Sequence, residues 1–265
     1  MTDAPAYVIL GRGRWAARMR SMLESESRSL ASIAETRRAA SESPWDYKSR
    51  IATSLLASFA TSPASSRARI AWLCVPPNDD LAAMIEAALE SDLHVIIEKP
   101  WTASRPATDA LISLARTRQR TIGVDFEFCY LKEVVNWKSN YSQRSDLSFN
   151  GRFMVDRSDH LGLPAEENLG SHLLAIRQFA APLSTLGEIR CAYESLSERA
   201  VWLASHGATL ARIDLVAARE PIVQRFIAIF EAACLENAPF ALDLEFAYRV
   251  AQDSAEIQRR TAAPR

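Results

Sequence analysis

Residues 7–16 read Tyr-Val-Ile-Leu-Gly-Arg-Gly-Arg-Trp-Ala, an apolar run that passes through two glycines into a helical pattern. The apolar run, 7–10, stops at Gly11, as a buried strand stops at a tight turn. From Trp15 to Leu23, apolar side chains then recur at helical spacing. The stretch therefore predicts a strand, a glycine turn and a helix in direct succession, which is how a parallel α/β sheet begins.

The glycine turn carries the pattern G-x-G-x-x-A, formed by Gly11, Arg12, Gly13, Arg14, Trp15 and Ala16. After a strand and at the start of a helix, these glycines permit a tight turn and a close approach of the backbone to a pyrophosphate. The helix N-terminus supplies N–H donors and a positive dipole. We therefore expect a dinucleotide to bind here, the alternative being a glycine-rich turn without a ligand.

An acid and two arginines follow the second predicted strand (residues 30–34). Glu35 lies about 20 residues beyond the glycines, where an acid would hold the adenosine ribose hydroxyls. Arg37 and Arg38 come next, and guanidinium planes suit a 2′-phosphate. The sequence therefore leaves NAD and NADP as equal alternatives, and a solvated loop is a third interpretation of these residues.

Strands and helices continue to alternate as far as residue 126. The expected elements are a helix over 51–59, a strand over 70–75, a helix from Asn78 or Asp79 to about 90, a strand over 94–97, a helix over 105–118 and a strand over 121–126. This alternation is typical of βαβ units. We predict an α/β chain whose residues 1–123 form a Rossmann domain with a doubly wound parallel sheet.

The second half has a different pattern. Strands are expected over 148–155, 188–193, 200–203 and 209–215, and helices over 168–179, 221–236 and 243–259. Only three or four short strands fit between residues 140 and 215. We predict a smaller α+β domain over residues 124–265 that helps to shape a substrate site and provides a dimerisation surface.

The composition excludes several classes of function. The 31 basic residues nearly balance the 32 acidic ones, so the chain has no strong field for nucleic acid or an anionic membrane. It has no 18-residue apolar stretch and no signal peptide pattern. The four cysteines are scattered without metal-ligand spacing. We expect a cytoplasmic protein with a small-molecule substrate, without metal, nucleic acid or membrane partner.

A second motif, Glu98-Lys99-Pro100, directly follows the strand predicted over 94–97. Ligands bind parallel sheets at the carboxyl ends of the strands, so Lys99 would point into the binding crevice. From there its ammonium group can donate to a substrate hydroxyl or carbonyl oxygen. The alternative is a surface lysine at a strand end.

Together with Pro76-Pro77-Asn78 one helix earlier and the glycine turn, this motif resembles the Gfo/Idh/MocA family, named after glucose-fructose oxidoreductase, inositol dehydrogenase and rhizopine catabolism. The resemblance covers essentially the whole chain and is strongest over residues 7–20 and 70–130. It implies an NAD- or NADP-dependent dehydrogenase or reductase. Such an enzyme transfers a hydride between nicotinamide and a hydroxyl, carbonyl or imine carbon of a sugar, polyol or biosynthetic intermediate.

The resemblance also implies roles for single residues. Those expected at the cofactor are Pro76, Asn78, Glu98, Lys99 and Pro100, and the Lys99–Pro100 bond is expected to be cis. Lys99 would act in catalysis and contact the substrate, and Tyr130 stands where family members often place a substrate-contacting aromatic residue.

The family's D-x-x-x-H signature occurs here with one change, as Asn168 to His172. The resemblance makes His172 the general acid/base, a role that suits a side chain titrating near neutral pH. Asn168 can orient the imidazole and contact substrate, but it supplies no charge. Ala175 stands where members usually carry another aspartate. The alternative is a histidine that packs on the apolar stripe of its helix.

These departures and the short second domain support a second hypothesis. The chain could be a catalytically degenerate member that binds dinucleotide and serves as a regulatory or scaffold protein. Retention of Lys99, His172 and both glycines favours the enzyme. The substrate and a homo-oligomeric state do not follow from the resemblance, because the missing length falls in the sheet that commonly forms both the substrate wall and the subunit interface.

Overall fold

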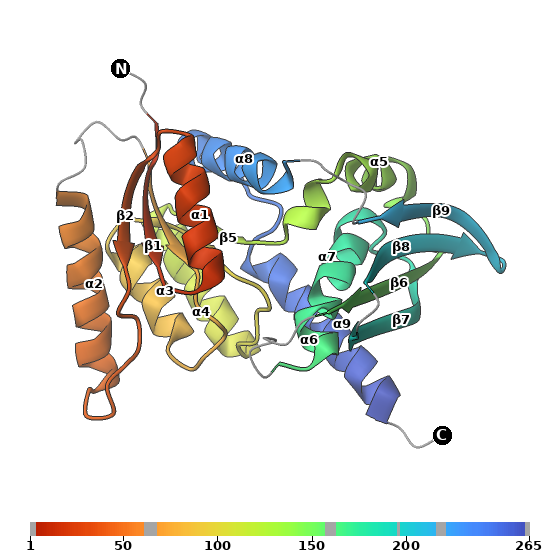
Figure 1. Cartoon of the computed structure of the whole chain (residues 1–265), viewed down its shortest axis with the longest axis horizontal. Coiled ribbons are helices and arrows are strands. Elements are labelled where there is room, and N and C mark those ends of the chain that lie inside the picture. Colours follow the sequence, from red (N-terminus) through yellow and green to blue (C-terminus); the bar gives the residue numbers. More distant parts are fainter. Residues whose placement is uncertain (1–3, 61–67, 157–162, 195–196, 216–220, 263–265) are drawn as a thin grey trace. The chain divides into compact units, whose positions relative to one another are not determined.

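The computed structural model describes residues 4–60, 68–156, 163–194, 197–215 and 221–262 (Figure 1). The chain forms two compact units, the first made by residues 1–125 and 228–245 and the second by 126–227 and 246–265. The division at residues 123 and 124 stays a prediction of domain limits. The compact units divide two residues later, and the segment 228–245 returns to the first unit.

The first unit contains a parallel five-stranded sheet in the order β2-β1-β3-β4-β5. Its strands are β1 (Ala6–Leu10), β2 (Ser29–Ile33), β3 (Arg69–Leu73), β4 (His94–Ile97) and β5 (Ile122–Val124). β1 pairs with both β2 and β3, so the direction of winding reverses there, at the kind of position where such sheets bind ligands. The predicted doubly wound parallel sheet is confirmed.

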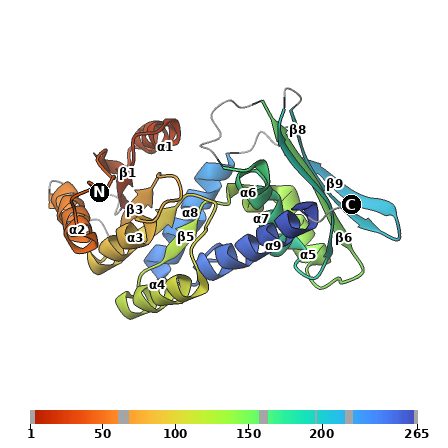
Figure 2. The ribbon, with the colours of Figure 1, turned by 90° about the horizontal axis from the view of Figure 1, so that it is seen from below.

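Four helices connect these strands: α1 (Arg14–Ser25), α2 (Pro44–Ala60), α3 (Leu81–Glu90) and α4 (Arg105–Arg118). α2 packs on α3 and α3 packs on α4 along one face of the sheet, and α1 lies on the other face (Figure 2). Right-handed crossovers require this arrangement on the two sides of a reversal.

α2 begins at Pro44, earlier than the predicted range of 51–59. Tyr47 is fully buried one turn before Ile51 and extends the same stripe. The intervening residues are polar because that face of the helix meets solvent. The apolar period was therefore present in the sequence one turn before the predicted start.

The start of α3 corrects the predicted helix cap. Asp80 holds the N-cap position, not Asn78 or Asp79. The Asn78 side chain instead closes the preceding turn, where its Oδ1 accepts from the Asp80 N–H (2.9 Å) and its Nδ2 donates to the Pro76 carbonyl (2.9 Å). The Asp80 carboxylate pairs with Arg38 Nε at 2.8 Å. That ion pair ties the loop after β2 to the beginning of α3.

α8 (Ile222–Glu236) contributes its later turns to the first unit. The Tyr7 hydroxyl donates to Glu231 Oε1 (2.7 Å), and an Arg28 guanidinium nitrogen lies 2.8 Å from Glu231 Oε2. A Cβ on Gly123 of β5 would lie 2.8 Å from the Phe230 ring, so only glycine fits beneath this helix. α8 is thus bonded to β1 and packed closely on β5.

His94 is a buried histidine of β4, with 6% of its surface exposed. Its Nδ1 accepts the backbone N–H of Thr121 at 3.1 Å. Burial, reinforced by the charge of Arg120, lowers the pKa of His94 from 6.5 to about 4. Between about pH 4 and pH 6.5, the imidazole is therefore neutral in the folded chain and protonated in the unfolded chain.

This difference predicts acid sensitivity. Because the unfolded state binds the extra proton, the free energy of unfolding should fall as the pH drops from 6.5 towards 4. His94 should account for about 2 kcal/mol of the loss between pH 7 and pH 5. Urea denaturation of the wild type and of His94→Gln at both pH values measures it. Equal losses in the two proteins would contradict this origin.

The second unit has a mixed four-stranded sheet in the order β7-β6-β8-β9. Its strands are β6 (Ser148–Val155), β7 (Thr185–Tyr193), β8 (Glu198–Ser205) and β9 (Ala208–Asp214). β6 is parallel to β7 and antiparallel to β8, which is antiparallel to β9. Four short strands agree with the predicted α+β architecture, which is confirmed.

Helices cover one side of this sheet. They are the 3-10 helix η1 (Glu127–Tyr130), α5 (Lys132–Tyr141), α6 (Ala165–Asn168), α7 (Gly170–Ala180) and α9 (Leu244–Ala262). α7 lies close to β6, where a Cβ on Gly151 would be 3.0 Å from Leu173. η1 and α5 were not predicted, and the strand predicted over 121–126 ends two residues beyond β5. No helix in the described ranges is long and apolar enough to cross a bilayer.

Candidate active site

The glycine turn leaves room for a ligand at the start of α1. Gly11 has φ +125°, and a Cβ there would lie 2.4 Å from the Cys74 carbonyl oxygen, so this position requires glycine. At Gly13, the N-cap of α1, a Cβ would meet no atom of the described chain within 4 Å. No described side chain caps α1. The first N–H groups of the helix and the open space at Gly13 therefore fit a pyrophosphate.

The rest of the fingerprint agrees with this use. The side chains of Arg12 and Arg14 are exposed beside the turn, where they add positive charge to the helix N-terminus. Ala16 is fully buried, at the position where the fingerprint needs a small residue for close helix–sheet packing. A dinucleotide would thus be held mainly by backbone donors.

Glu98 joins the E-K-P motif to the glycine turn. Its Oε1 accepts the indole N–H of Trp15 at 2.6 Å and that of Trp72 at 3.0 Å. Cys74 lies against the same oxygen, and burial, followed by the charges of Glu98 and Asp125, raises the pKa of the Cys74 thiol well above its usual value. The thiol is therefore neutral. The two tryptophan donors were not predicted from the sequence.

Lys99 follows β4 at the carboxyl edge of the sheet and is half-buried, and the Lys99–Pro100 peptide bond is cis. On the neighbouring strand, Asp125 follows β5, and its N–H donates to the Ile97 carbonyl at 2.9 Å. Asp125 is 1% exposed. Asp125 was not among the predicted site residues, although an acid directly after a buried strand, at the ligand-binding edge, is a visible signal.

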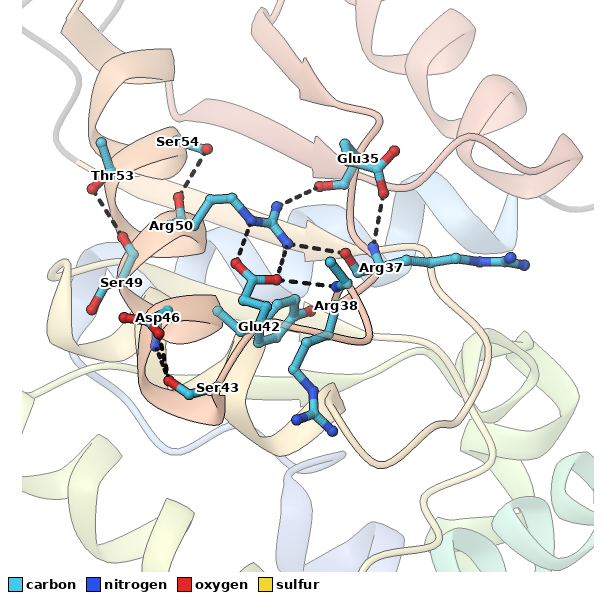
Figure 3. A network of polar contacts seen from close by, with 12 residues as sticks. Glu35, Arg37, Arg38, Glu42, Ser43, Asp46, Ser49, Arg50, Thr53 and Ser54 are labelled. Carbon is cyan, nitrogen blue, oxygen red and sulfur yellow. Dashed lines mark hydrogen bonds and ion pairs between the residues drawn. The ribbon is translucent and has the colours of Figure 1, made fainter.

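Figure 3 shows the loop after β2, which holds the predicted ribose-binding residues. Glu35 Oε1 accepts the backbone N–H of Arg37 at 3.3 Å. The exposed Arg37 side chain extends away from the network, whereas Arg38 pairs with Asp80. The sequence predicted the same role for both arginines, but in the structure Arg38 has a carboxylate partner and the Arg37 side chain extends into solvent.

Arg50 of α2 holds this loop in shape. It forms a two-pronged contact with Glu42, at 2.8 and 3.0 Å, and donates to the carbonyls of Glu35 (3.3 Å) and Arg37 (3.0 Å) (Figure 3). The Arg50 hydrogen bond lowers the pKa of Glu42. Neither Glu42 nor Arg50 was predicted as a site residue, because the polar stretch around them has no hydrophobic period.

In the second unit, His172 of α7 lies between two aromatic rings. Phe128 of η1 meets the imidazole edge-on at 5.0 Å between centroids, and Phe153 of β6 stacks on it at 5.4 Å and 13°. His172 Nδ1 is 3.9 Å from Glu127 Oε2. The histidine thus packs in the apolar interior and also has a carboxylate beside it.

Asn168 is buried at the end of α6. Its Nδ2 donates to the Tyr193 hydroxyl at 3.0 Å, and that hydroxyl donates to the Leu163 carbonyl at 3.2 Å. The amide is therefore fixed by β7. Its predicted substrate contact and its orientation of the imidazole stay predictions.

Tyr130 is 5% exposed at the end of η1. Its ring packs edge-on against Phe179 (5.8 Å) and at a tilt against Phe226 (6.3 Å), and burial raises the pKa of its phenol. Tyr130 therefore forms part of the core of the second unit, and its contact with substrate stays a prediction.

Residues 6–126 match the model of an oxidoreductase family with an NAD-binding Rossmann fold, named GFO_IDH_MocA. These residues therefore form the NAD-binding domain of a Gfo/Idh/MocA oxidoreductase. A search of curated protein sequences finds no match. The resemblance inferred from the glycine turn and E-K-P is thereby confirmed.

Solved structures share the fold over nearly the whole chain. UDP-N-acetylglucosamine 3-dehydrogenase GnnA from Acidithiobacillus ferrooxidans is 14% identical, with a TM-score of 0.75 over 95% of this chain and 96% of that one. The 3-ketoreductase KijD10 from Actinomadura kijaniata, in complex with TDP-benzene and NADP, is 16% identical, with a TM-score of 0.64 over 96% and 97%. The WlbA dehydrogenase from Thermus thermophilus, in complex with NAD and UDP-GlcNAcA, is 12% identical, with a TM-score of 0.64 over 98% and 95%. At these identities, the likeness establishes the fold.

The predicted site residues form two groups, and only the first lies in the domain that matches the Gfo/Idh/MocA model. The first unit brings together the glycine turn, Pro76, Asn78, Glu98, Lys99, Pro100 and the loop with Glu35, Arg37 and Arg38, all at the carboxyl edge of its sheet. The second unit contains Tyr130, Asn168 and His172, together with the unpredicted Glu127. No group of three or more His, Cys, Asp or Glu side chains in the described ranges is arranged to hold a metal ion.

From the structure of the loop after β2, we expect Arg37 to contribute to the affinity for NADPH but not to that for NADH. Arg37→Ala should weaken NADPH binding about tenfold, equal to about 1.4 kcal/mol, and leave NADH affinity nearly unchanged. The reason is that the exposed Arg37 can turn to a 2′-phosphate, whereas Arg38 already has a carboxylate partner. Fluorescence titration measures both affinities, with Arg38→Ala as the matched control. Equal changes for NADH and NADPH would rule out a 2′-phosphate role.

Proposed function

We propose that this chain oxidises or reduces a hydroxyl or carbonyl carbon on the sugar of a nucleotide-linked sugar, using NAD or NADP. The observation that carries the proposal is the carboxyl edge of the first sheet. There, an open glycine turn and an uncapped helix follow β1, and Lys99 follows β4, with only β3 between the two strands. Glu98 connects the two segments through Trp15. The names of GnnA and KijD10, and the ligand of WlbA, support the choice of substrate class.

Lys99 would stabilise charge on the reacting oxygen. When bound, the nicotinamide supplies or accepts the hydride. In the reduction direction, negative charge grows on the carbonyl oxygen, and a fixed ammonium donor there lowers the barrier. In the oxidation direction, the same contact holds the hydroxyl in place while the carbon loses hydride.

His172 would exchange the hydroxyl proton. In oxidation, the neutral imidazole takes the proton as the C–O bond becomes a carbonyl, and in reduction it returns the proton. Its packing between Phe128 and Phe153 fixes the ring, so the nitrogen that meets the substrate would be the same in every turnover.

A degenerate, dinucleotide-binding regulatory protein is the second candidate. Asn168 in place of aspartate and Ala175 in place of a second one favour it. A carboxylate 3.9 Å from His172 opposes it, because a histidine without a proton-transfer role gains little from a buried acid beside it.

One experiment separates the two candidates. The full chain is titrated with NADH and NADPH while the fluorescence of Trp15 and its neighbours is followed, and turnover is then measured with UDP- and TDP-linked 3-keto sugars, their alcohols, and the free sugars. We expect cofactor binding, and turnover that is faster with the nucleotide-linked substrates than with free sugars. Tight cofactor binding without turnover of any member of the panel would favour the regulatory protein.

A further inference from the structure

The His172 side chain has a carboxylate neighbour that the D-x-x-x-H pattern does not provide. Glu127 Oε2 lies 3.9 Å from His172 Nδ1, and the two side chains are only 12% and 10% exposed. Glu127 belongs to η1, far from His172 in the sequence. We propose that Glu127 is a positioning residue that orients His172 and stabilises its protonated form, in place of the missing carboxylate at position 168. The catalytic part of this inference rests on the proposed function.

The local structure fixes the two groups relative to one another. η1 starts three residues after β5, and its turn is closed by hydrogen bonds from the Cys129 N–H to Phe126 and from the Leu131 N–H to Phe128. Phe128, the residue after Glu127, packs on the imidazole edge. Any movement of η1 would therefore shift both the carboxylate and the ring that clamps His172. The backbone of η1 therefore sets the position of the Glu127 carboxylate relative to the Phe128 ring that contacts His172.

The interaction is one of charge. A separation of 3.9 Å is within ion-pair range but beyond a direct hydrogen bond, so the carboxylate acts through its field or through one water. Because both groups are buried, that field is screened less than it would be at the surface. It favours the protonated imidazole, which is the form that returns the proton during reduction.

Other charged and titratable groups surround α7 on the elements packed against it. They are Cys129 and Tyr130 on η1, Lys138 on α5, Glu166 and Glu167 on α6, Cys191 and Tyr193 on β7, Arg199 on β8, and Asp253 on α9, which pairs with Arg177 of α7 at 2.6 Å. Two of these groups are cations that lie over aromatic rings: Arg199 is 5.3 Å from the centroid of Phe153, the ring stacked on His172, and Lys138 is 4.0 Å from the centroid of Phe179. Both oppose a protonated His172. Glu127 Oε2, 3.9 Å from His172 Nδ1, lies within ion-pair range of the imidazole.

Nuclear magnetic resonance titration of the full chain tests the inference directly. The chain has four histidines, and the His172 signal is the one that His172→Gln removes. Glu127→Gln keeps the side-chain shape and removes the charge, so the titration midpoint of His172 should fall by about one pH unit or more. Glu133→Gln, the same change at an exposed position of α5, should leave it unchanged. An unchanged midpoint in folded Glu127→Gln would overturn the inference.

A second variant separates charge from packing. Glu127→Asp retains the carboxylate, so its midpoint should lie much closer to that of the wild type than the midpoint of Glu127→Gln does. Equal shifts in both variants would contradict a role through charge. With a true substrate, kcat of Glu127→Gln should fall more than KM rises, and the pH profile of kcat should move with the measured midpoint. The titration needs no turnover, so an inactive wild type would refute the proposed function without touching the pairing.

Discussion

Lys99→Ala should lower kcat by about 10² to 10³, because loss of one fixed donor to the developing charge typically costs a few kcal/mol. Cofactor affinity should stay within about threefold, since backbone groups of the glycine turn would hold most of the dinucleotide. The measurement is steady-state turnover with a substrate identified from the panel, combined with NADH and NADPH titration. A fall in kcat without a matching loss of binding is the signature of a group that acts on the reacting oxygen.

Two further variants sharpen this test. Lys48→Ala removes a lysine of the same unit that pairs with Glu86 and Glu90 on α3, away from the carboxyl edge, and should leave kcat unchanged. Lys99→Arg keeps the charge but changes its reach and geometry, so it should restore only part of the lost rate. Wild-type turnover by Lys99→Ala would eliminate the proposed role of this lysine.

Gly13→Asp should abolish dinucleotide binding, with affinity for NADH and NADPH reduced by about 10²-fold or more. The φ of −72° suits any residue, and the new side chain meets no described atom near its Cβ, so the protein should fold. Aspartate is also a preferred N-cap residue and should stabilise α1 by about 1 kcal/mol. Its carboxylate would occupy the place of the pyrophosphate and take over the same N–H groups.

Thermal denaturation together with cofactor titration measures both effects. The expected combination is an unchanged or higher Tm with no detectable binding. Gly13→Ala, which adds a methyl group without charge, is the matched control and should bind more tightly than Gly13→Asp. Full cofactor affinity in folded Gly13→Asp would refute the assignment of this turn as the pyrophosphate site.

Local patterns in the sequence predicted the first sheet well. The run before Gly11 is apolar at every position because β1 is buried on both faces, and the helix after it shows a clear period. The resemblance at Glu98-Lys99-Pro100 also gave the cis bond correctly. These features depend on residues close together in the chain, which a pattern can record.

Features that depend on distant residues were missed. The segment around Phe126 and Tyr130 is apolar and aromatic, so its pattern could not distinguish a strand from the 3-10 helix that the structure contains. Glu127 meets His172 only after η1 and α7 pack together. Likewise, Glu98, which follows β4, accepts hydrogen bonds from Trp15 of α1 and Trp72 of β3. The hydrophobic periodicity of a sequence does not indicate contacts between residues so far apart in the chain.

The return of residues 228–245 to the first unit bears on the order in which the nascent protein can fold. Tyr7 and Glu231, hydrogen-bonded to each other, are 224 residues apart, and the Val124 N–H donates to the Leu242 carbonyl at 2.8 Å. All five strands of the first sheet precede residue 125, but the packing of the first unit is completed only after the ribosome has made the intervening residues 126–227. Until then, the surface that α8 covers is exposed, and partners that bind exposed apolar chain, such as chaperones, have time to act.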